Sequence, residues 1–204
     1  MTDPRVDHLV YAVPDLRQGV ADFAARTGVS PVLGGCHPGG TANYLVGLGP
    51  SAYLEIIGPD PDNPDVEPPA LDLDRPRLVT WAIRPDDLDK CVERARELGY
   101  DPGDVQPLSR RTPDGTLLEW RLTGWDDPAV VRPVPFLIDW GAAAHPAASG
   151  LPQLELLSLA AVDPDPEAVT RRLAAVSAEL EVSSGAETGL RAVLGTPRGP
   201  VTLD

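Results

Sequence analysis

Two polar side chains stand inside apolar runs of the chain, where each could do chemistry. His8 lies near the start of "VDHLVYAVPDL" (residues 6–16), in a chain with 3 histidines, and Glu55 lies within "YLEII" (residues 53–57). An imidazole binds metal ions or transfers protons near neutral pH. A carboxylate inside an apolar strand is costly unless it is paired, hydrogen-bonded or bound to a cation. Both residues are therefore candidates for a buried site, against the alternative of polar residues that the fold tolerates.

The alternation of side chains along a strand predicts which way these two residues point. In the first run, His8 shares a face with Val10, and the bulkier side chains occupy the other face. We expect the bulkier set to pack against a helix, so that His8 lies on the opposite, concave side. In the second run, Glu55 shares its face with Tyr53. We predict that His8 and Glu55 approach each other across this concave face.

A weak internal repeat surrounds these residues. Three times an apolar run leads through Pro and Asp into an amphipathic helix, in "HLVYAVPDLRQGVADFAARTG", "LVTWAIRPDDLDKCVERARELG" and "LELLSLAAVDPDPEAVTRRLAAVSAEL". We expect Asp15, Asp86 and Asp165 to cap the helices, and Gly28 and Gly99 to close the first two. About three strand-like runs follow each helix. This order predicts an α+β fold with a mostly antiparallel sheet.

The repeat divides the chain into three units within one compact body. We expect a first unit over 1–66, a second over 67–145 and a shorter, partial third over 146–204, with linkers at 60–77 and 141–152. Each sheet has one face covered by its helix. The other face must pack against another unit or enclose a cavity. For the third unit the sequence leaves three roles open: it extends the sheet, covers an edge, or pairs across a homodimer interface.

Composition excludes several classes of partner. The net charge of -14 repels phosphate backbones and anionic membranes, so nucleic acid and membrane surfaces are not expected partners. No basic segment leads a long apolar stretch at the start, and no run approaches the roughly 20 apolar residues that span a bilayer. We therefore expect a soluble cytoplasmic protein. The 2 cysteines imply no disulfide framework, and no nucleophile-elbow, CxxC or phosphate-loop motif is present.

The order of these elements resembles the vicinal oxygen chelate superfamily, and its glyoxalase-like domain group in particular. "DHLVYAVPDL" matches the first strand and helix start, and "YLEII" matches the fourth strand. The wider series "HPGGTANYLVGLG…YLEII", "PVPFLIDWG" and "HP…G…L" extends the resemblance over most of the chain. The resemblance implies paired βαβββ modules that curl a mixed or antiparallel sheet into a cup around a metal or ligand site.

The resemblance also implies metal ligands on the first and fourth strands of each unit. His8 and Glu55 match those positions in the first unit. In the second unit, Leu78 falls at the histidine position and cannot ligate, Thr80 follows on the same face, and Asp139 falls at or beside the glutamate position. The implied set is His8, Glu55 and Asp139 around one divalent ion, such as Zn, Ni, Mn or Fe. Otherwise the metal site is lost and the cup remains a binding pocket.

Further residues could line the cup. Asn43 could orient a substrate carbonyl or cap a turn, and Thr80 could face the same space. Trp120 is one of 4 tryptophans, all in the second unit, which suit either a planar ligand or the packing between units. For His37 and His145, which precede prolines in loops, we expect loop packing rather than ligand gating.

Two functions follow from the resemblance. In an enzyme, a metal would chelate neighbouring oxygens of a small oxygenated molecule, and Glu55 or Asp139 would act as general base in isomerase, lyase or dioxygenase chemistry. In a drug-sequestering or other binding protein, the cup would hold a small molecule without chemistry, and the acidic surface would slightly favour a cation. Because Leu78 replaces a ligand, we expect weak or absent metal binding.

Overall fold

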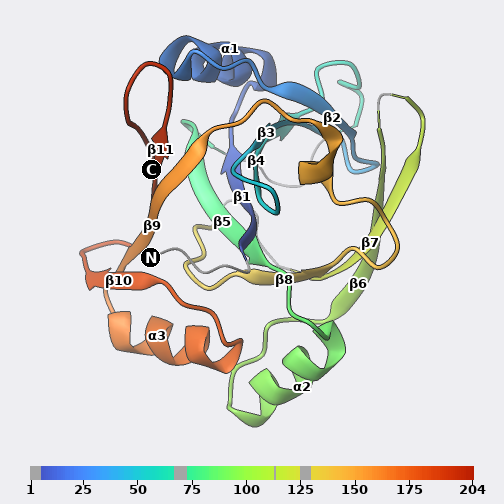
Figure 1. Cartoon of the computed structure of the whole chain (residues 1–204). Helices are drawn as coiled ribbons and strands as arrows, with labels where there is room; N and C mark the ends of the chain where they lie inside the picture. Colours follow the sequence, from blue (N-terminus) through green and yellow to red (C-terminus); the bar gives the residue numbers. More distant parts are fainter. Residues whose placement is uncertain (1–5, 67–72, 113, 125–129) are drawn as a thin grey trace.

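The computed structural model describes residues 6–66, 73–112, 114–124 and 130–204. Within these ranges, the order of one strand, one helix and three strands occurs three times (Figure 1). The first unit holds β1 (Val6–Ala12), α1 (Leu16–Thr27), β2 (Val32–Cys36), β3 (Thr41–Gly47) and β4 (Tyr53–Pro59). The second holds β5 (Arg77–Ile83), α2 (Leu88–Glu97), β6 (Val105–Arg111), β7 (Leu117–Thr123) and β8 (Phe136–Asp139). A 3-10 turn, η1 (Pro146–Ser149), precedes the third, which holds β9 (Glu155–Asp163), α3 (Pro166–Ala175), β10 (Glu181–Ser184), β11 (Gly189–Gly195) and β12 (Val201–Leu203).

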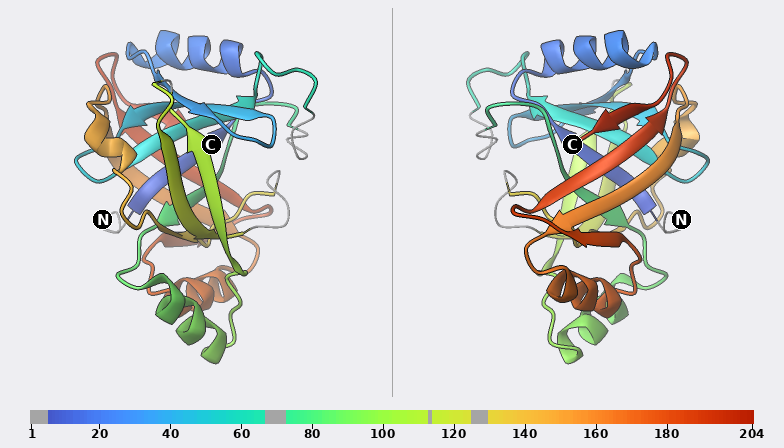
Figure 2. Two further views of the ribbon diagram at one scale, coloured as in Figure 1. Left: turned by 90° about the vertical axis from the view of Figure 1, so that its right-hand side faces the viewer. Right: turned by 90° about the vertical axis from the view of Figure 1, so that its left-hand side faces the viewer.

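The strands of the first two units close into one barrel, in the order β1-β4-β3-β2-β6-β7-β8-β5. The first strand of each unit pairs with its fourth in parallel, β1 with β4 and β5 with β8, while the other neighbours run antiparallel. The halves meet at β1–β5 and at β2–β6. Figure 2 shows the barrel from two sides, with α1 at one end and α2 at the other. The predicted α+β class and curled mixed sheet are confirmed.

Most of the helix ends lie at the residues that the sequence predicts. The Asp15 carboxylate accepts from the amide three residues on, and Gly28 closes α1 in the left-handed region at φ 77. Asp165 caps α3 in the same way. The expected cap of α2 is wrong by one residue, because Asp87 and not Asp86 accepts from the amide of Lys90. None of the helices in the described ranges is both long and apolar enough to cross a bilayer.

The third unit is not partial: it repeats the full order of elements and forms its own sheet, β10-β9-β11-β12. This sheet lies against the outside of the barrel beside β5, as Figure 2 shows. Leu78 and Trp81 of β5 share one buried cluster with Leu159 and Leu194 of the third sheet. The amide of Leu78 also donates to the carbonyl of Asp204 at 2.8 Å. The third unit therefore covers an outer face of the closed barrel, rather than an edge, and does not extend its sheet.

Candidate functional site

The barrel encloses a cavity of about 610 Å³. Much of its wall is apolar, and Tyr53, Trp120, Phe136 and Trp140 supply aromatic surface. The polar side chains that reach the wall are few, and those that bear on its chemistry are His8, His37, Asn43, Glu55 and Arg110. A mostly apolar cavity with a small number of convergent polar groups is the usual form of a small-molecule site.

His8 and Glu55 face each other inside this cavity. Nε2 of His8 lies 3.9 Å from Oε2 of Glu55, and their side chains are 5% and 12% exposed. The approach follows from the parallel pairing of β1 with β4, in which His8 pairs with Tyr53 and Glu55 with Val10. The His8 ring also stacks on the Tyr53 ring, with centroids 4.7 Å apart. The predicted approach of these two residues across the concave face is confirmed.

Asp7 contacts the His8 ring at Nδ1, the nitrogen that does not face Glu55. It is fully buried, and its Oδ1 lies 2.7 Å from Nδ1 of His8. The β1–β5 ladder shifts register between Val6 and His8, which leaves Asp7 at an irregularity of the strand. Bulges of this kind re-aim side chains beside functional sites. Because Nδ1 of His8 engages Asp7, Nε2 is the nitrogen left to face Glu55 and the cavity.

The second oxygen of Asp7 is also fully engaged. Oδ2 accepts from Nε1 of Trp140 at 3.1 Å and lies 2.9 Å from Nε2 of His145. The amide of Ala147 donates to Nδ1 of His145, so the proton of this ring sits on Nε2 and is donated to Asp7. Burial alone raises the pKa of Asp7, but the hydrogen bonds from His145 and His8 outweigh it and hold that pKa well below its usual value. Asp7 is thus a carboxylate that fixes the orientation of His8.

Glu55 is positioned by Asn43. Nδ2 of Asn43 donates to Oε1 of Glu55 at 2.5 Å, which leaves Oε2 toward His8. Oδ1 of Asn43 is buried without a hydrogen-bond partner in the structure. It packs over Gly34, where an added Cβ would lie 2.3 Å from it. Asn43 therefore lines the cavity and orients the carboxylate.

Asp139 does not join this pair. Its neighbours Ile138 and Trp140 line the cavity, so the alternation along β8 turns Asp139 outward. Its carboxylate accepts from Nη2 of Arg121 at 2.9 Å and from the amide of Gly141 at 2.8 Å. The Arg121 guanidinium, helped by that amide, lowers the pKa of Asp139. The expectation that Asp139 ligates a metal or acts as base in the cup is wrong, because the side chain is on the other face of the strand.

The expected phase of β5 is also wrong. Thr80 does not line the cavity, and its hydroxyl points to the carbonyl of Trp81. Val10 pairs with Thr80 and Tyr11 with Leu78, which leaves Val79 between them as a bulged residue. Val79 is the side chain that reaches the cavity wall. The bulge therefore gives the cavity an apolar side chain from this part of β5, and the alternation of the sequence does not reveal it.

The donor set in the cavity does not fit a firmly held metal ion. Within the described ranges, no three His, Cys, Asp or Glu side chains converge as a ligand group. His8 and Glu55 are two such donors, and catalytic zinc sites use three from the protein. His37 lines the same cavity, but its Nδ1 lies 3.0 Å from Oγ1 of Thr41, and burial lowers its pKa.

The tryptophans divide between wall and core. Trp120 and Trp140 line the cavity with ring centroids 5.3 Å apart. Trp81 is instead fully buried and donates to the carbonyl of Pro133 at 2.7 Å. Trp125 lies outside the described residues.

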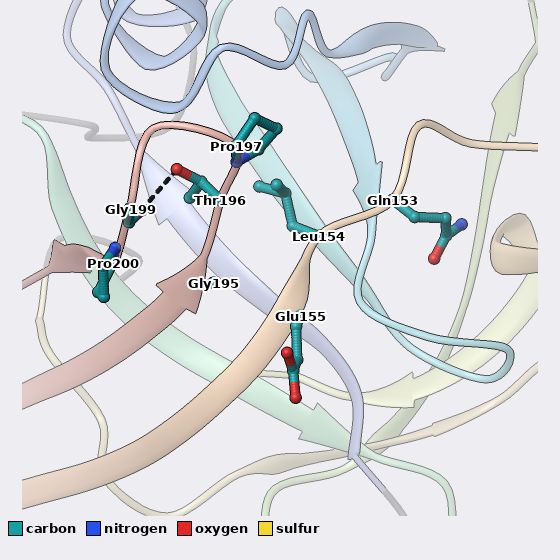
Figure 3. Close-up of a pocket in the computed structure, with 8 residues that line it drawn as sticks. All are labelled: Gln153, Leu154, Glu155, Gly195, Thr196, Pro197, Gly199 and Pro200. Atoms are coloured by element: carbon teal, nitrogen blue, oxygen red, sulfur yellow. Dashed lines mark hydrogen bonds between the residues drawn. The ribbon is translucent and has the colours of Figure 1, made fainter.

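Figure 3 shows a second depression, of about 410 Å³, on the third unit. It is lined by the start of β9 and by the β11–β12 turn, in which Oγ1 of Thr196 donates to the carbonyl of Gly199. Glu155 carries the one ionisable side chain among its lining residues. This surface lacks the convergent groups that distinguish the barrel cavity.

Residues 6–177 of the sequence match the family model of the glyoxalase-like domain. The chain belongs to the glyoxalase-like domain family. No curated protein matches this sequence. Among solved structures, this glyoxalase-like chain is similar to a hypothetical protein from Staphylococcus aureus, with a TM-score of 0.65, 12% identity and 98% coverage of both chains.

Two enzymes with lower TM-scores are also similar. Methylmalonyl-CoA epimerase from Mycobacterium tuberculosis has a TM-score of 0.41 at 21% identity, covering 68% of this chain and 89% of that one. A mutant of 4-hydroxymandelate synthase from Streptomyces coelicolor has 0.48 at 16%, covering 98% of this chain and 62% of that one. At such identities a likeness concerns the fold of the glyoxalase-like protein and not its activity.

Proposed function

We propose that this glyoxalase-like protein is an enzyme that moves a proton on a small oxygenated molecule held in the barrel cavity, in an isomerase or lyase reaction. The observation that supports it is the orientation of His8, whose Nδ1 is bound to Asp7 at 2.7 Å while its Nε2 faces Glu55 at 3.9 Å. An imidazole with a buried carboxylate behind it and a free nitrogen in front is the arrangement that general acid–base catalysis uses.

The two groups have complementary roles in this proposal. A separation of 3.9 Å between Nε2 of His8 and Oε2 of Glu55 is longer than a hydrogen bond, so both atoms stay free to engage one ligand. Glu55 removes a proton from the bound molecule, and His8 gives a proton to, or takes it from, a neighbouring oxygen. Asn43 keeps the carboxylate aimed by donating to its other oxygen. Asp7 stabilises the imidazolium that forms when His8 takes up a proton.

A divalent ion is the cofactor that the resemblance implies, and His8 and Glu55 are the two residues that would hold it. Two protein donors leave most of the coordination to water or substrate. We therefore derive no step of the reaction through a metal.

Ligand binding without chemistry is the second candidate. The paired Trp120 and Trp140, together with Tyr53 and Phe136, give the cavity an aromatic wall suited to a planar molecule. This wall supports binding in either case, whereas the alignment of Asp7, His8 and Glu55 favours proton transfer.

The test is proton exchange in D₂O. Small ketones, 2-oxo acids and 2-hydroxy acids are incubated with the protein, and loss of the α-proton is followed by NMR. We expect exchange with at least one compound, and a fall of about a hundredfold or more in His8→Gln. Binding of a compound without any exchange would support the binding protein instead. Exchange that His8→Gln leaves unchanged would contradict the assigned roles.

A further inference from the structure

The cavity wall carries a buried guanidinium that the proposed proton transfer does not use. Arg110, on β6, is 4% exposed and lines the cavity. Its Nη1 donates to the carbonyl of Gly34, and within the described part of the chain it makes no ion pair with Asp or Glu. A guanidinium has five N–H donors, and burying its charge is costly unless it is paired. Among the described residues only one of these donors has an acceptor, the carbonyl of Gly34.

The neighbouring strand is shaped to accept this side chain. An added Cβ at Gly35 would lie 3.0 Å from Nη1 of Arg110 and 2.2 Å from the carbonyl oxygen of Arg111. Gly35 also has a φ of 150, which other residues rarely adopt. The glycine pair Gly34 and Gly35 thus lets the guanidinium lie directly on the backbone of β2. This close approach fixes Nη1 of Arg110 and directs the other N–H groups of the guanidinium to the cavity.

The charges around Arg110 do not neutralise it. Glu55 shares the cavity wall, yet it forms no ion pair with Arg110 and is bound by Asn43. His37 and Tyr53 also line the cavity. Burial lowers the pKa of His37 and raises the pKa of Tyr53, so neither side chain is charged at neutral pH. The positive charge of Arg110 therefore faces the cavity beside an aromatic wall.

We propose that Arg110 binds the carboxylate of the substrate, so that the cavity takes a small oxygenated carboxylic acid whose reacting carbon faces His8 and Glu55. The position of the reacting carbon rests on the function proposed above, whereas anion binding by Arg110 does not depend on it. The planar fork matches a carboxylate with two parallel hydrogen bonds. One guanidinium on a largely apolar wall suits a monoanion better than a phosphate dianion. Arg110 thus gives the cavity a group that binds anions, whereas the net charge of -14 suggested a slight preference for cations.

The test compares two probes that differ in charge and share a shape, phenylacetate and phenylacetamide. Their affinities are measured by calorimetry or by the fluorescence of the tryptophans in the wall. The variants are Arg110→Gln, Arg110→Lys and Arg111→Gln. Arg111 is the matched control because it is the exposed neighbour on the same strand and removes the same charge. The ratio of the two affinities within one sample does not depend on the fraction of protein that is folded.

We expect the wild type to bind phenylacetate about tenfold or more tightly than phenylacetamide, the worth of a charge-assisted hydrogen bond. Arg110→Gln should bring the ratio close to one, Arg110→Lys should keep part of it, and Arg111→Gln should leave it unchanged. Equal binding of both probes by the wild type, no binding of phenylacetate, or an unchanged ratio in Arg110→Gln would overturn the proposal. Since no turnover is read, a selective but inactive protein would contradict the proposed function alone.

Discussion

Asp7 and His145 lie 138 positions apart in the chain, and Oδ2 of the first meets Nε2 of the second at 2.9 Å. Asp7 belongs to β1, at the start of the first unit, and His145 precedes the 3-10 turn that leads into the third. The contact fixes the carboxylate that in turn orients His8. A segment that looks like a linker in the sequence thus supports the centre of the candidate site.

The low pKa of Asp7 predicts how stability depends on pH. The pKa of Asp7 in the folded protein lies below 3.8, the ordinary value for an aspartate in the unfolded chain. Ionised Asp7 therefore stabilises the fold fully above pH 3.8, and this contribution is lost as the pH falls through the folded-state pKa. Asp7→Asn should lower the free energy of unfolding by on the order of 3 kcal/mol at neutral pH, because it leaves buried donors without a charged acceptor.

Denaturant unfolding of wild type and Asp7→Asn across the acid range checks this. The difference between them should stay constant above the pH at which unfolded Asp7 titrates, and it should shrink below it. A difference that grows as pH falls would show that the carboxylate is not stabilised by its neighbours.

His145 and Asp7 should act as one unit. His145→Ala removes a donor to Oδ2 of Asp7 and should cost about 1–3 kcal/mol of unfolding free energy. In the double variant with Asp7→Asn the cost should be clearly less than the sum of the two single costs. Double-mutant cycles by chemical denaturation measure the difference. Additive costs would mean that the contact contributes nothing of its own.

Glu55→Gln should leave the fold intact. The amide can still accept from Asn43, and the change removes the cost of a largely buried charge. The melting temperature should therefore equal or exceed that of the wild type. Added Mn²⁺, Ni²⁺ or Zn²⁺ should shift neither protein by much, since two donors hold an ion weakly. A large metal-induced rise in the wild type that Glu55→Gln abolishes would establish a metal site and contradict the donor count.

Gly34 should not tolerate a side chain. An alanine there places Cβ 2.3 Å from Oδ1 of Asn43 and 2.8 Å from Cγ of Leu45. Relieving these contacts should cost about 1–3 kcal/mol of unfolding free energy and should disturb the aim of Glu55. Gly124→Ala is the matched control, because its nearest neighbour would be at an ordinary 3.5 Å. Equal stabilities of the two variants would refute the claim that Gly34 is needed for β2 to pack closely against Asn43 and Leu45.

The part of the site that the sequence predicts depends on local periodicity. The alternation along β1 and β4 places His8 and Glu55 on one face because both strands are regular there, and the repeat of strand, helix and strands gives the barrel. The same reasoning fails on β5, where the bulge at Val79 shifts the phase that put Thr80 inside. The error on β8 has another cause: the family resemblance, and not the alternation along the strand, implied a ligand at Asp139, while Ile138 and Trp140 line the cavity.

The contacts that the sequence could not predict arise when the barrel closes. Nothing in the sequence indicates that His145 and Trp140 converge on Asp7. Arg110 lies beside Arg111 in a run without clear alternation, so the buried member of the pair cannot be told from the exposed one. Its position becomes evident only when β6 is set against Gly34 and Gly35 of β2.

The central claim, that the carboxylate inside the barrel moves the proton, is tested most directly by comparing two isosteric changes. Glu55 faces His8 in the cavity, and Asp139 lies outside the wall on Arg121. The rate of α-proton exchange in D₂O is measured for Glu55→Gln and Asp139→Asn on the compound that the wild type exchanges fastest. We predict a fall of about a hundredfold or more in Glu55→Gln and nearly the wild-type rate in Asp139→Asn. Similar rates in the two variants, or a greater loss in Asp139→Asn, would contradict the claim.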